Sequence, residues 1–73
     1  MQADDLPEAT CVALEKYIAM AHKQTHAPVE NIRRAIYCQL PMLDAKKVAA
    51  LPPKEVAVGL VHGAMVILGG IKQ

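Results

Sequence analysis

The fold is decided by residues 53–68, which read PKEVAVGLVHGAMVIL. The Pro-Lys-Glu start is typical of a helix N-terminus, and Gly69-Gly70 directly after the stretch is a strong helix stop signal. The many β-branched residues make a buried strand the alternative. The length of the apolar run and its two terminal signals favour a helix over residues 53–68.

This helix is expected to be apolar on nearly every side, because His62 is the main polar residue within it. A helix with no polar face lies in a protein core or in a membrane. The apolar run from Val56 to Leu68 is 13 residues long, whereas roughly 20 are needed to cross a bilayer. We therefore expect no membrane contact. Two arrangements remain open: the other helices enclose this one, or they leave one side for a partner.

Two glycines, Gly59 and Gly63, interrupt the apolar run one helical turn apart. Each costs a helix interior about 1 kcal/mol relative to alanine, and close approach of another backbone would offset that cost. The approaching helix belongs either to the same chain or to a second copy, and we expect a homodimer as well as a protein partner. The residues predicted to bind the partner are Tyr37, Gly59, His62, Gly63 and Val66.

Three further helices are predicted before this one, because prolines stand where helices should start or stop. The connection between the first two is short, so they should pack as a hairpin. We expect an all-α fold, a compact bundle of three to four helices in a single domain over residues 1–73. The expected helices span about 6–25, 28–40, 44–50 and 53–68.

Two carboxylates are predicted to cap helix N-termini: Asp5, in a capping box with Glu8, and Asp44, at the start of the short third helix. Apolar residues recur at helical spacing along the first three helices. Those predicted to face the core are Cys11, Leu14, Tyr17, Ile18, Ala21, Val29, Ile32, Ile36, Leu40, Leu43, Val48 and Leu51.

Composition and charge exclude several classes of protein. Hydrophobic residues make up 53% of the chain and charged residues 21%, which argues against disorder. A formal net charge of +1 provides no overall field for a polyanion. Cys11 and Cys38 are too few for a secreted disulfide scaffold, and the acidic, polar residues 1–5 are unlike the start of a signal peptide. We therefore expect a cytoplasmic protein.

Basic residues gather only locally, at Arg33 and Arg34 and at Lys46 and Lys47. They make a nucleic-acid-binding accessory domain the alternative function, with these four side chains on the phosphates. An ordinary solvated surface is the other interpretation. The short third helix lacks the polar side chains that read base edges, so sequence-specific recognition is not expected.

His22 and His26 lie one helical turn apart, a spacing at which two imidazoles could share a metal ion. No third ligand follows at a suitable spacing, so we interpret them as helix-end residues that interact with the helix dipole. Apart from Asp4-Asp5 at the N-terminus, no carboxylate pair, nucleophile–base pair or Gly-rich phosphate loop indicates catalysis. The sequence predicts no enzyme, no metal and no cofactor.

A stretch from His26 to Leu51 carries a resemblance. It contains Glu30-Asn31-Ile32, then Ile36-Tyr37-Cys38-Gln39-Leu40, and ends at Leu51-Pro52 before the last helix. This stretch resembles the small helical accessory domains of phage antirepressor-type and related mobile-element proteins. The resemblance implies a small phage- or plasmid-type protein that binds another protein as a regulator or inhibitor. Together with the residue pattern, it predicts a non-catalytic, self-associating interaction module.

Overall fold

The computed structural model describes residues 2–70, and every regular element in that range is helical. The four α-helices are α1 (Glu8–Thr25), α2 (Val29–Gln39), α3 (Ala45–Ala50) and α4 (Pro53–Gly70). Two short 3-10 helices, η1 (Ala3–Asp5) and η2 (Leu40–Met42), precede α1 and follow α2. The predicted all-α fold is therefore confirmed. The helix bounds lie close to the expected ones, but α4 continues through Gly69 and Gly70, which were predicted to stop it after Leu68.

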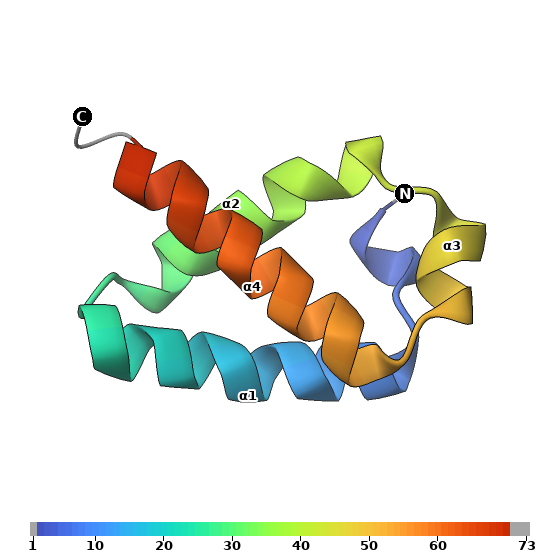
Figure 1. The fold of residues 1–73 in the computed structure, drawn as a ribbon, viewed down its shortest axis with the longest axis horizontal. Coiled ribbons are helices and arrows are strands. Elements are labelled where there is room, and N and C mark those ends of the chain that lie inside the picture. The colour runs from blue at the N-terminus through green and yellow to red at the C-terminus, as the bar shows by residue number, and fades with distance from the viewer. Residues whose placement is uncertain (1, 71–73) are drawn as a thin grey trace.

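Helix α4 lies across α1 and α2 and packs against both of them (Figure 1). α1 and α2 form the expected hairpin, with few contacts between them compared with those that each makes to α4. α3 lies at one end of the molecule, beyond the end of α2 (Figure 1). Among the described residues, no helix is both long enough and apolar enough to cross a membrane.

The core lies between α4 and the hairpin. Ile32 and Ile36 of α2 are almost completely buried, and Ala57 and Ala64 of α4 expose no surface. Small residues at these two α4 positions let the helix axis approach its neighbours closely. The other buried hydrophobic residues are Leu6, Leu14, Ile18, Ala21, Ala35, Leu40, Val48, Val56, Leu60 and Val61. The hairpin thus covers one side of α4.

Three further predictions about local structure are wrong. Asp5 does not cap α1: the helix begins at Glu8 after Pro7, with no side-chain cap, and the Asp5 carboxylate accepts a hydrogen bond from the Gln2 backbone N–H instead (3.1 Å). Cys11 is exposed, because α1 is rotated so that the neighbouring Thr10 faces the core. Leu51 is also exposed, because it leaves α3 in an extended conformation (ψ 151°) and so departs from the helical face of Val48.

The predicted Asp44 cap is confirmed, whereas the contacts of the two histidines at the end of α1 were not predicted. The Asp44 carboxylate accepts a hydrogen bond from the backbone N–H of Lys46 (2.9 Å) and caps α3. His26 ends α1 in the left-handed region (φ 61°), and its N–H donates to the His22 carbonyl. The His22 ring Nδ1 lies 2.6 Å from the carbonyl oxygen of Ala27. Both histidines therefore take part in the turn between α1 and α2.

Candidate partner-binding surface

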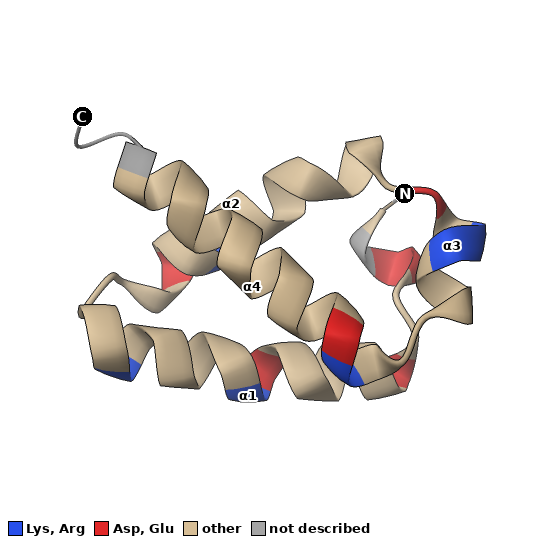
Figure 2. Cartoon of the chain, in the orientation of Figure 1, with Lys and Arg blue, Asp and Glu red and all other residues tan. Residues whose placement is uncertain are grey.

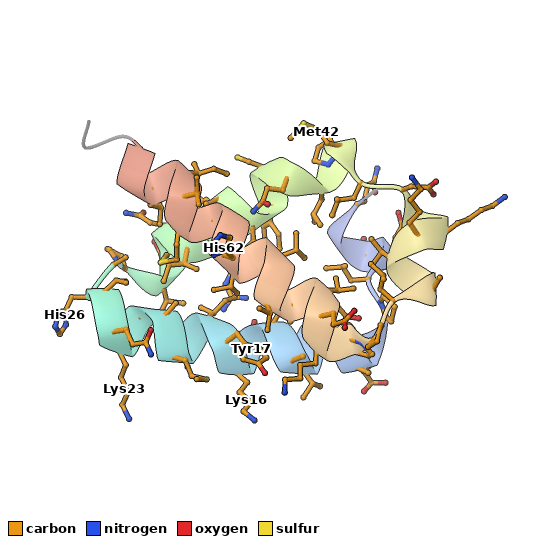
Figure 3. The ribbon with its side chains drawn as sticks, viewed as in Figure 1. Lys16, Tyr17, Lys23, His26, Met42 and His62 are labelled. Carbon is orange, nitrogen blue, oxygen red and sulfur yellow. The ribbon has the colours of Figure 1, made fainter. Side chains whose placement is uncertain are left out.

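The side of α4 that faces away from the hairpin stays exposed. We call this surface the outward face of α4 and define it by Val58, Gly59, His62, Val66 and Gly69, which are all exposed and recur at helical spacing. The side chains of Val58 and Val66 are 44% and 61% exposed, although both are valines within a helix of the core. His62 lies in front of the α4 ribbon, on the side facing the viewer (Figure 3).

The outward face of α4 carries no charged side chain. The only charged residues of α4 are Lys54 and Glu55 in its first turn. Figure 2 shows charged positions on α1, on α3 and at the start of α4, while the rest of α4 has none. Exposed apolar side chains that share one face of a helix mark an interaction site more often than apolar side chains scattered singly over a surface do.

The two glycines of α4 have different environments. A Cβ atom added to Gly59 would meet no heavy atom within 4 Å, so packing inside the chain does not require a glycine there. A Cβ atom added to Gly63 would collide with the side-chain oxygen of Gln39 and lie 3.0 Å from its Cδ. Gly63 is therefore explained within the chain, whereas Gly59 is not.

Gln39 connects α2 to α4 through the space that Gly63 leaves. Its side-chain Nε2 donates to the Leu60 carbonyl of α4 (3.0 Å) and to the Ala35 carbonyl of α2 (3.2 Å). Sequence reasoning missed this role, because nothing local to Gln39 indicates contact with a glycine so far along the chain. The signal that could have indicated it is not local: Gln39 ends one predicted helix, and Gly63 leaves space for a side chain in another.

Tyr37 lies away from the outward face of α4. It lines a small pocket between α1 and α2, to which α4 contributes no residue. In the same pocket, Arg33 donates two hydrogen bonds to the Glu15 carboxylate, one of them 3.0 Å long from Nη2 to Oε2. The structure thus brings Gly59, His62 and Val66 together and leaves Tyr37 on a different surface.

The Arg33–Glu15 pair also changes the electrostatics of that surface. The hydrogen bond from Arg33 lowers the pKa of the Glu15 carboxyl, and the same bond raises the pKa of Arg33. Both groups therefore stay ionised, and the positive charge of Arg33 lies beside the negative charge of Glu15. Among the four predicted phosphate-binding residues, Arg34 is exposed on α2, and Lys46 and Lys47 are exposed on α3 at the end of the molecule (Figure 2). The four side chains do not form one unpaired basic patch.

The remaining candidate residues show no further site chemistry. Within residues 2–70, no three His, Cys, Asp or Glu side chains are grouped so that they could hold a metal ion. Cys11 and Cys38 are both free thiols and both exposed. An open groove of about 600 Å³ lies between the α1–α2 turn and the end of α4, and its lining includes Pro28, Met65 and Leu68.

Comparison of the chain with protein-family models, with curated proteins and with solved structures finds no match.

Proposed function

We propose that this protein is a small non-catalytic helical interaction module that binds a protein partner through the outward face of α4. One observation carries the proposal: after α1 and α2 have covered one side of α4, the opposite side still exposes Val58, His62 and Val66 without a charged residue among them. Full burial of one valine side chain contributes about 1.5–3 kcal/mol, so a partner that covers two half-exposed valines gains a substantial binding free energy.

The chemistry of the surface describes its partner. The partner presents aliphatic side chains, because the outward face of α4 offers no ion pair and only one imidazole. Gly59 leaves open space at which another backbone can approach closely. A helix is the element that fits a single exposed helical stripe of this kind.

A non-catalytic module of this kind acts through binding alone, by covering a surface of its partner. A phage- or plasmid-type regulator or inhibitor is the concrete form of this proposal, and it is supported by the resemblance carried by residues 26–51. Nucleic-acid binding is the less favoured function, because Arg33 is paired with Glu15 and the lysines of α3 lie on a separate element.

Two matched substitutions test the proposal. Val66→Asp places a carboxylate on the outward face of α4, and Val12→Asp places one on α1; the two valines are 61% and 67% exposed. Both variants should fold, which circular dichroism would check. In pull-downs from the native host, Val12→Asp should retain the partner captured by the wild type, and Val66→Asp should lose it. Equal capture by both variants, or capture of DNA lost on mutation of Arg34, Lys46 and Lys47, would overturn the proposal.

A further inference from the structure

We draw no further inference here: the strongest candidate, the open groove of about 600 Å³ between the α1–α2 turn and the end of α4, is lined by uncharged side chains and one imidazole, and nothing in the part of the chain that the structure describes shows what covers it.

Discussion

The contact between Gly63 and Gln39 makes a quantitative prediction about stability. Gly63→Ala would place a methyl group against the Gln39 carboxamide, whose Cδ lies 3.0 Å and Nε2 3.2 Å from the added Cβ. The side chain of Gln39 must then swing away and lose its hydrogen bond to the Leu60 carbonyl. Because this side chain is flexible, the methyl group is accommodated, and the effect of the substitution is the sum of two opposing free energies.

The two free energies are of similar size. Replacing a glycine within a helix by alanine stabilises the folded state by about 1 kcal/mol. Losing the Gln39–Leu60 hydrogen bond costs about 1 kcal/mol. Gly63→Ala in the wild-type chain should therefore change the free energy of unfolding little. In a Gln39→Ala background the methyl group meets no carboxamide, so the same substitution should stabilise the protein by about 1 kcal/mol.

Urea unfolding of the four proteins in this double-mutant cycle measures the coupling, at a low concentration where the chain is monomeric. The expected coupling free energy between residues 39 and 63 is about 1 kcal/mol. A difference of this size corresponds to about 4–8 °C in the melting temperature of a domain this small. Additive effects, with Gly63→Ala equally stabilising in both backgrounds, would refute the explanation of Gly63.

Three further predictions follow from the same structure. Gly59→Ala should raise the melting temperature of the dilute protein by about 4–8 °C, because it gains helix propensity without a collision; a destabilised variant would contradict the open space at Gly59. Ala64→Leu should lower the free energy of unfolding by about 1–3 kcal/mol, because the larger side chain overpacks a fully buried position. Chemical denaturation would measure this change, and an unchanged free energy of unfolding would contradict the burial of Ala64. Glu15→Gln should destabilise the protein at neutral pH by up to about 1 kcal/mol. Because the folded-state pKa of Glu15 is lowered, this difference should be present above its ordinary value of 4.5 and vanish as the pH falls through the folded-state pKa; a difference independent of pH would contradict the Arg33 pair.

Helix positions were largely predictable from the sequence, and helix orientations were less so. Prolines and Asp44 act through local backbone geometry, so they placed the helix starts closely. Gly69 and Gly70 did not stop α4 after Leu68, because the helix continues through them. Cys11 and Leu51 were assigned wrongly, because the rotation of α1 and the extended exit from α3 are set by packing between helices. A small rotation of a helix can therefore bury one residue and expose its neighbour, and the spacing of apolar residues in the sequence does not reveal which of the two is buried.

The candidate surface lay at the limit of what the sequence could predict. A helix that is apolar all round has no polar stripe to show which side faces solvent, so the position of Val58 and Val66 on the outward face emerged only from the packing of α4 on the hairpin. The role of Gln39 depends on a contact with a residue distant in the chain. Tyr37 was grouped with α4 although it faces a pocket between the other two helices.

The most direct test of the account compares the backbone amide resonances of the wild type by NMR before and after addition of the protein partner that it captures from its host. The amides of Val58, Gly59, His62 and Val66 should shift when the partner is added, while that of Val12 on the exposed side of α1 should not. Shifts centred on α1 or α3, with none along the outward face of α4, would contradict the claim that this face is where the protein binds its partner.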